Sequence, residues 1–254
     1  MREVNHFHYC LSFLSWEMDN NMKNSSFSFI IRVIGLTIIL IIWKWFIDQQ
    51  FELMTELTII IGGVIAVVPI SFLGRLFLNK YPLVEYTHWI NMIIHFSIMI
   101  CLGVSIIRAI LTYENWRGVI IPFPKEISLI LVITSGFFIM ITTLYLALRG
   151  LGAPFALIAN SKYLVSDWLY ARTRNPMVLT IILLLLSLGL FFQSMWFIIW
   201  VLILVLPAWI FFLKYYEEKE LEIRFGDTYR EYKAHTPILL PKNTKIQKSR
   251  RKIR

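Results

Sequence analysis

The chain has 254 residues, of which 57% are hydrophobic and only 16% are charged, with a mean hydropathy of +0.65 and a formal net charge of +9. Several apolar runs approach the roughly 20 residues that a bilayer core requires, so this composition indicates a polytopic membrane protein. Two cysteines, Cys10 and Cys101, exclude a disulfide-rich scaffold.

The N-terminal segment, Met1 to Ser26, carries acidic residues among aromatic ones and has no small-residue cleavage site after a basic start. We therefore expect an interfacial arm rather than a cleaved signal. Four apolar runs follow, at Phe29 to Phe46, Leu57 to Phe77, Trp89 to Leu111 and Ile127 to Leu148. Each is too long and too weakly alternating to be a strand, and in lipid a helix satisfies its backbone groups within one segment.

A further apolar stretch runs from Val178 to Leu213 and is interrupted only by Gln193 and Ser194. This pattern predicts a helical hairpin that turns at the polar pair and returns the chain to the side it left. With the four preceding runs, the sequence predicts an all-α protein with about six membrane helices. Arg32 and Arg108 lie near the ends of apolar runs and are expected to extend to the interface.

Two polar signatures flank the hairpin. The segment LYARTRNPM, Leu169 to Met177, precedes it, and EEKELEIRFGDTYREYKAHTPILLP, Glu217 to Pro241, follows it. Because a hairpin brings its two ends together, we expect Arg174 and Asn175 to face Glu217 and Glu218 at one membrane surface.

The segment after the hairpin predicts a helix from Lys214 to Phe225, ended by Gly226, which tolerates positive φ. Asp227 is placed to begin a second short helix that runs from Thr228 to about Ala234. An amphipathic face is expected on Leu221, Phe225, Tyr229 and Tyr232, and Pro237 and Pro241 end the element.

Basic residues predict the orientation. With six crossings and a cytoplasmic C-terminus, one side holds Arg2, Lys23, Arg75, Lys80, Arg149, Lys162, Arg172, Arg174 and the basic tail, and the other mainly Lys44, Arg117 and Lys125. The positive-inside rule favours this topology, with both termini and both polar signatures in the cytoplasm.

Three regions follow from this pattern: residues 1–148 with the arm and four membrane helices, residues 149–241 with the polar signatures and the hairpin, and a basic tail at residues 242–254. The tail follows a membrane helix, so anionic lipid headgroups are its expected partner rather than nucleic acid. A solvated tail that only sets topology is an equal alternative. No set of His, Cys and carboxylate residues at zinc spacing is found, and no metal site is expected.

The polar signatures also carry a resemblance. The order Tyr-x-x-x-Arg-Asn-Pro-Met, an apolar hairpin, Glu-Glu-x-x-Leu-x-x-x-Phe-Gly-x-x-Tyr-x-x-Tyr and a final Pro resembles the isoprenylcysteine carboxyl methyltransferase and phospholipid methyltransferase superfamily. It covers roughly the last hundred residues, starting near Gly150. Two positions differ from many members, which have His at Asn175 and Tyr at Val178.

The resemblance implies a membrane methyltransferase that uses S-adenosylmethionine and acts on a lipophilic acceptor. The cofactor-binding residues expected from it are Arg174, Asn175, Pro176, Val178, Glu217, Glu218 and Tyr229, with Arg174 and Glu218 also in the catalytic role. A guanidinium suits the methionyl carboxylate, and carboxylates accept hydrogen bonds from ribose hydroxyls or the amino group.

Each assignment has an alternative reading. Arg174 can serve as a topology charge, Pro176 fits the first turn of a helix regardless of function, and Glu217 and Glu218 can pair with Lys or Arg at helical spacing. Two other functions also stay open. One is an NADPH-dependent reductase of the sterol reductase kind, although its usual Arg-His-x-Asn-Tyr pattern is absent, and the other is a member of the methyltransferase fold that has lost activity.

Overall fold

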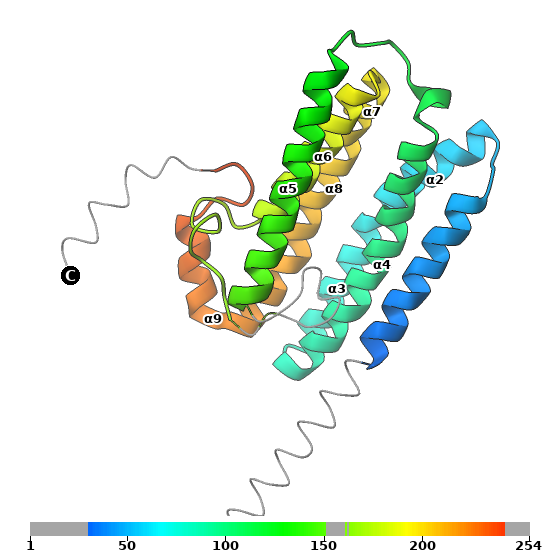
Figure 1. Ribbon diagram of the computed structural model, residues 1–254. Coiled ribbons are helices and arrows are strands. Elements are labelled where there is room, and N and C mark those ends of the chain that lie inside the picture. The colour runs from blue at the N-terminus through cyan, green and yellow to red at the C-terminus, as the bar shows by residue number, and fades with distance from the viewer. Residues whose placement is uncertain (1–29, 151–160, 162, 242–254) are drawn as a thin grey trace, which may run out of the picture.

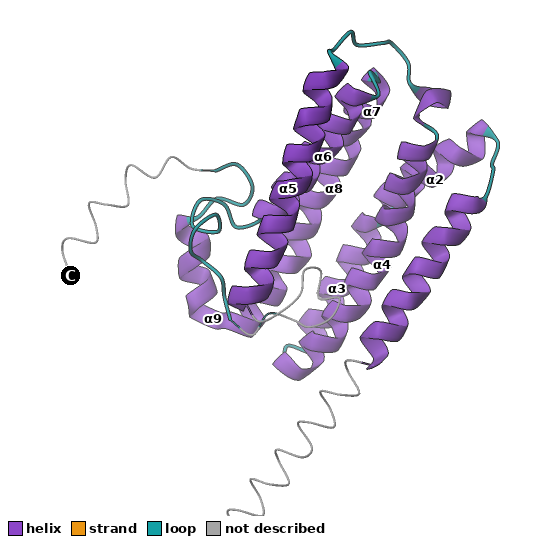
Figure 2. Cartoon of the chain, viewed as in Figure 1, coloured by secondary structure: helices purple, strands orange, loops and turns teal. Residues whose placement is uncertain are grey.

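The computed structural model describes residues 30–150, 161 and 163–241. This part of the chain forms a bundle of antiparallel helices joined by loops, and it contains no strand (Figures 1 and 2). The predicted all-α class is confirmed. The N-terminal arm and the basic tail lie outside the described residues.

The first half of the bundle contains the helices Ile30–Asp48, α2 (Leu53–Ile65), α3 (Val67–Lys80) and α4 (Val84–Leu111). One apolar run supplies both α2 and α3, which are separated at Ala66. Pro69 explains this break, because proline cannot donate to the carbonyl four residues earlier and its ring clashes with it.

The second half contains α5 (Lys125–Gly150), α6 (Pro176–Phe191), α7 (Met195–Trp200), α8 (Leu206–Phe212) and α9 (Glu218–His235). The chain turns between α6 and α7, where Gln193 has a φ of 53° and the Ser194 hydroxyl accepts a hydrogen bond from the Phe197 amide at 3.2 Å. The predicted hairpin and its turning point are confirmed.

Two π-helical turns interrupt the returning arm of the hairpin, at Val201–Val205 and Leu213–Glu217. The first lies just before Pro207, and the wider turn accommodates a proline, which has no backbone N–H to donate within the helix. The second lies at the end of the apolar stretch and leads directly into α9. The charged residues from Lys214 onward therefore follow the apolar stretch of this arm.

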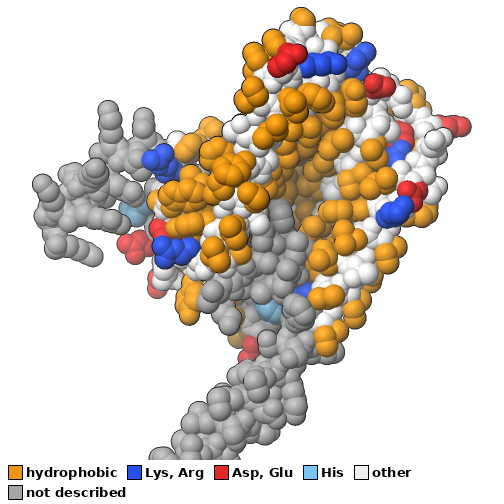
Figure 3. Space-filling model, in the orientation of Figure 1, with side chains coloured by type: hydrophobic (Ala, Val, Ile, Leu, Met, Phe, Trp, Pro, Cys, Tyr) orange, Lys and Arg blue, Asp and Glu red, His pale blue; other side chains and the backbone are white. Residues whose placement is uncertain are grey.

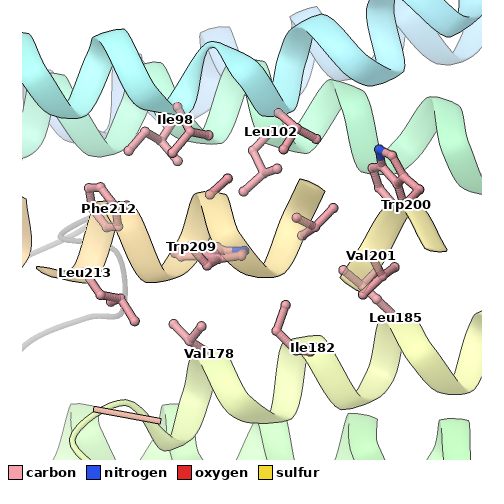
Figure 4. Packing of buried hydrophobic residues seen from close by; sticks show 14 of the residues in the cluster. Ile98, Leu102, Val178, Ile182, Leu185, Trp200, Val201, Trp209, Phe212 and Leu213 are labelled. Atoms are coloured by element: carbon pink, nitrogen blue, oxygen red, sulfur yellow. The ribbon is translucent and has the colours of Figure 1, made fainter. Parts of the chain in front are cut away.

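The core lies along the returning arm of the hairpin. Trp209 and Phe212 of α8 lie between Ile98 of α4 and Val178 of α6 (Figure 4). Because α4 and the two arms of the hairpin all contribute large apolar side chains, the N-terminal helices and the hairpin share one core. Residues of α4 are thereby brought against the segment that carries the second polar signature.

Much of the outer surface is also apolar. Large side chains such as Ile41, Met54, Ile130 and Leu148 are exposed, and hydrophobic side chains cover most of the face drawn in Figure 3. Apolar surface is unfavourable in water by about 25 cal/mol per Å², so this surface fits a lipid environment. Five helices of the described part are long and apolar enough to span a membrane, whereas α6 is shorter. An integral membrane protein is supported, and the number six remains a prediction.

The expectation that Arg32 and Arg108 extend to the interface is wrong. Arg32 is 1% exposed and its Nη2 lies 2.9 Å from Nε2 of His88. Arg108 is also buried and forms a two-pronged ion pair with Glu56, in which Nε donates to Oε2 at 2.9 Å and Nη2 bonds to Oε1. A buried charge is stable only when it is paired, and the pairing of Arg108 fixes the start of α2 against the end of α4.

Candidate active site

A pocket opens at the end of the bundle where α9 lies. It is lined by parts of α4, α5, α6, α8 and α9 and by the loop between α5 and α6. The lining residues are Asn91, His95, Leu146, Ser161, Tyr163, Leu164, Val165, Tyr170, Arg174, Asn175, Met177, Val178, Trp209, Phe212, Glu217, Glu220, Leu221, Arg224, Phe225, Tyr229 and Tyr232. Both predicted polar signatures therefore meet at one cavity, whose lining combines charged residues with apolar ones; the apolar part, which includes Val178, Trp209 and Phe212, is named the floor.

Arg174 is the basic residue that the first signature contributes to this pocket. Its side chain is only 9% exposed, and its Nη1 donates to Glu218 Oε1 at 2.9 Å and to the hydroxyl of Tyr229 at 3.2 Å. Its Nε is buried and has no hydrogen-bond partner in the described part of the chain. An unsatisfied buried donor is costly unless a ligand completes it, so this nitrogen fits an anionic group bound in the pocket.

The backbone around Arg174 is held by the segment after α9. The amide of Arg174 donates to the carbonyl of Pro237 at 2.9 Å, and the Asn175 side-chain Nδ2 donates to the carbonyl of Ile238 at 3.0 Å. The Thr173 hydroxyl donates to the same carbonyl of Ile238 at 3.3 Å. The end of the described chain thus folds back and fixes the first polar signature.

Not every predicted residue lines the pocket. Pro176 is buried at the first turn of α6, where its fixed φ suits the helix start. Glu218 lies behind Arg174 and also pairs with Lys233, which in turn contacts Glu222 at 3.0 Å. The structure therefore places Glu218 as the partner of Arg174, whereas Arg174, Asn175, Val178, Glu217 and Tyr229 reach the cavity.

Glu217 also lines the pocket, and it forms no ion pair with any residue that the structure describes. Burial, followed by the nearby carboxylates of Glu220 and Glu218, raises its pKa to about 8. Arg224 and Arg174 oppose that shift. At neutral pH this carboxyl group is therefore largely protonated, and a cation bound beside it would favour its ionisation.

Gly226 separates two parts of α9, as the sequence predicted. Its φ of 55° and ψ of −131° are non-helical and lie in a region that glycine adopts without strain. The bend brings Tyr229 under Arg174 and lets the Tyr232 hydroxyl donate to the carbonyl of Tyr170 at 2.6 Å. Burial raises the pKa of Tyr229, so it remains a neutral hydroxyl donor and acceptor.

Several pocket residues were not expected from the sequence. Asn91 and His95 come from α4, and Trp209 and Phe212 from the hairpin, where apolar composition alone indicated packing or lipid contact. The spacing of four between Asn91 and His95 puts them on one helix face, which is the only signal that they act together.

Comparison with known proteins supports the interpretation of the polar signatures. Residues 125–228 match the family model for phospholipid methyltransferase. This match begins with α5 and ends within α9, so it contains Arg174, Asn175, Glu217 and Glu218. No curated protein and no solved structure gave a match to the chain. The predicted resemblance to that superfamily is thereby confirmed for residues 125–228.

Proposed function

We propose that the protein is an integral membrane methyltransferase that transfers a methyl group from S-adenosylmethionine to a lipophilic or membrane-partitioned acceptor. The observation that carries this proposal is the convergence of Arg174 and Glu217 from the two sides of the hairpin on one pocket, within the segment that matches the phospholipid methyltransferase family model. Each residue offers the pocket a polar group with ligand-binding capacity.

The polar groups fit the amino-acid end of S-adenosylmethionine. The unsatisfied Nε of Arg174 would bind the methionyl carboxylate, with Nη1 kept in place by Glu218 and Tyr229. Glu217 would accept hydrogen bonds from the amino group or the ribose. When bound, the cofactor supplies an activated methyl group on a positively charged sulfur.

The protein's own part in such a reaction is alignment and exclusion of water. Val178, Trp209 and Phe212 are buried and belong to the apolar floor of the pocket. Holding two reactants in line in such an enclosure contributes as much as about 7 to 11 kcal/mol to lowering a barrier. Three hydrogen bonds, one each from Thr173, Arg174 and Asn175, hold this part of the backbone, so the guanidinium of Arg174 starts in a defined position.

The two departures from the family pattern have local explanations. Val178 is 4% exposed and packs into the floor, where it contributes apolar contact and no hydroxyl. Asn175 uses Nδ2 to hold Ile238, and no hydrogen bond to its Oδ1 is found in the described part of the chain. This oxygen remains as an acceptor for the cofactor, so activity is compatible with both residues.

A reductase function is less well supported. NADPH carries three phosphate groups, whereas the pocket lining includes the carboxyl groups of Glu217 and Glu220 beside Arg174. Arg224, a further cation of the lining, is already paired with Glu220 at 2.8 Å. The acidic residues of the lining therefore favour a ligand with a cationic end over a polyphosphate.

The pocket end of the bundle is proposed to face the cytoplasm. The helix Ile30–Asp48 begins at the same end of the bundle as α9, and the turn between α6 and α7 lies at the other end (Figure 1). The predicted bias of Lys and Arg then places the pocket where a soluble cofactor is available.

Product analysis tests the proposed function. Purified protein would be incubated with methyl-labelled S-adenosylmethionine and a membrane lipid extract, and labelled products identified by mass spectrometry. We expect a methylated lipophilic product. A protein that binds S-adenosylmethionine but releases no labelled product would indicate a member without activity, and one that binds NADPH instead would indicate the reductase function.

A further inference from the structure

His95 contributes an imidazole to the floor of the same pocket, from a helix outside the matched domain. His95 is 7% exposed, and its Nδ1 lies 2.9 Å from the backbone carbonyl oxygen of Asn91. A carbonyl oxygen only accepts hydrogen bonds, so Nδ1 carries the proton of the neutral ring. Nε2 therefore holds a lone pair, and no hydrogen bond to it is found among the described residues.

The surroundings of His95 fix the orientation of this ring. Phe212 and Tyr216 meet it edge to face, with ring centroids 5.4 and 6.3 Å away. The Tyr216 hydroxyl donates to Oδ1 of Asn91 at 3.2 Å, which anchors the residue that holds Nδ1. A pocket-lining imidazole with one nitrogen bonded and the other unbonded is arranged to accept a proton from a bound molecule.

We propose that Nε2 of His95 is the proton acceptor for the methyl-accepting substrate. This proposal rests on the methyltransferase function proposed above and assigns the acceptor a class, namely molecules whose nucleophilic atom carries a proton, such as an amine, a thiol or a phenol. The proton passes from that atom to Nε2 of His95, and the bonding pair stays on the atom. This pair then forms the bond to the methyl carbon, while the pair of the broken carbon–sulfur bond leaves with the sulfur.

Glu217 is less suited to this role, because its carboxyl group is largely protonated at neutral pH. It also lies near Arg174, Glu218 and Glu220, and together with Arg174 it is assigned to the cofactor. His95 lies instead with Trp209 and Phe212 on the apolar floor, where the lipophilic part of an acceptor would bind. We therefore assign Arg174 and Glu217 to the cofactor, and His95 with its apolar neighbours to the acceptor.

The test compares His95→Gln with the parent and with Ser97→Ala, a control on the exposed face of α4. Methyl transfer from labelled S-adenosylmethionine to a membrane lipid extract, dodecylamine, decanethiol, nonylphenol and decanoate would be measured. Methyl esters release methanol in base, whereas N-, S- and phenol-methyl products are stable. We expect His95→Gln to lower base-stable transfer about 100-fold or more, with ester formation and S-adenosylmethionine binding unchanged.

Two outcomes would overturn the proposal: a parent protein that forms only base-labile esters, or a variant that loses ester and base-stable transfer equally. A readout independent of turnover is the ¹⁵N NMR spectrum of protein that contains ¹⁵N-labelled histidine. The His95 signals are assigned by their absence from the spectrum of His95→Gln. The His95 Nε2 resonance should be that of an unprotonated ring nitrogen and should shift when dodecylamine is added with S-adenosylhomocysteine. A protonated Nε2 would contradict the role, whereas failure of the parent to bind S-adenosylmethionine would instead refute the proposed function.

Discussion

The guanidinium of Arg174 lies 2.9 Å from the carboxylate of Glu218, although the whole hairpin separates the two residues in sequence. This ion pair closes the hairpin at its polar end and leaves Nε of Arg174 for the pocket. Glu218 is therefore a positioning residue in our account, and Arg174 is the residue that contacts the ligand.

Glu217 should make cofactor affinity depend on pH. Its pKa is raised from 4.5 to about 8, so Glu217 is protonated below that pH. Binding of a cationic ligand there requires Glu217 to release its proton, which lowers the affinity. We expect the affinity for S-adenosylmethionine to increase as the pH rises towards 8 and then to level off. Glu217→Gln should remove this dependence, and Glu222→Gln, a control next to Lys233, should keep it. Calorimetric titrations from pH 6 to 9 measure the effect, and equal slopes in the parent and Glu217→Gln would refute the assignment.

The same group affects stability with a defined sign. Because the folded pKa exceeds the ordinary value, the contribution of Glu217 to stability is fully present below about pH 4.5 and is lost as the pH rises through about 8. Relative to the parent, Glu217→Gln should therefore gain thermal stability as the pH is raised from 6 to 9.

Truncation separates the site from the basic tail. Removal of residues after Lys242 leaves Pro237 and Ile238 in place, so cofactor affinity in detergent should stay within about twofold of the parent. Removal of residues after His235 deletes both carbonyls that hold Arg174 and Asn175, and it should weaken binding at least tenfold, since several hydrogen bonds of about 1 kcal/mol each are lost. Parent-like binding by the shorter chain would show that the folded-back segment does not position the site.

The buried pair of Arg108 and Glu56 should matter for stability but not for cofactor affinity. Glu56→Ala leaves a buried guanidinium without its carboxylate and should destabilise the protein by about 3 to 5 kcal/mol. The double variant with Arg108→Leu should recover part of this loss. Thermal unfolding in detergent measures the effect, with Lys44→Ala, from an exposed pair, as the control. A Glu56→Ala protein as stable as Lys44→Ala would contradict the burial of the pair.

The proposed orientation can be tested by labelling. In a chain with Cys10→Ser and Cys101→Ser, a cysteine placed at exposed Thr228 should react with an impermeant thiol reagent only after permeabilisation of cells. A cysteine at exposed Gln50, on the opposite end of the bundle, should react without it. The reverse pattern would place the pocket outside and separate it from the cytoplasmic cofactor.

The sequence predicted the features that depend on neighbouring residues. The apolar runs indicated the helices, Gln193 and Ser194 marked the turn, and Gly226 marked the bend in α9. The convergence of Arg174 with Glu218 followed from the hairpin alone. These predictions succeeded because a helix period and a turn have local signals.

The contacts between distant helices could not be predicted in the same way. The partner of Arg108 is set by how α2 packs on α4, and the position of His95 in the pocket is set by how α4 packs on α8. The same holds for Asn175, whose side chain bonds to the segment after α9. In each case a polar residue within or beside an apolar run has many candidate partners, and only the packing selects one.

The central claim is that Arg174 binds the carboxylate of S-adenosylmethionine, and a calorimetric titration of the purified protein tests it most directly. Arg174→Ala should weaken binding about 10- to 150-fold, corresponding to about 1.5 to 3 kcal/mol for a charged hydrogen bond. Arg230→Ala, which removes an exposed arginine of α9 that pairs with Asp227, should bind like the parent. Equal affinity of the parent and Arg174→Ala for S-adenosylmethionine, with both proteins folded, would contradict the account.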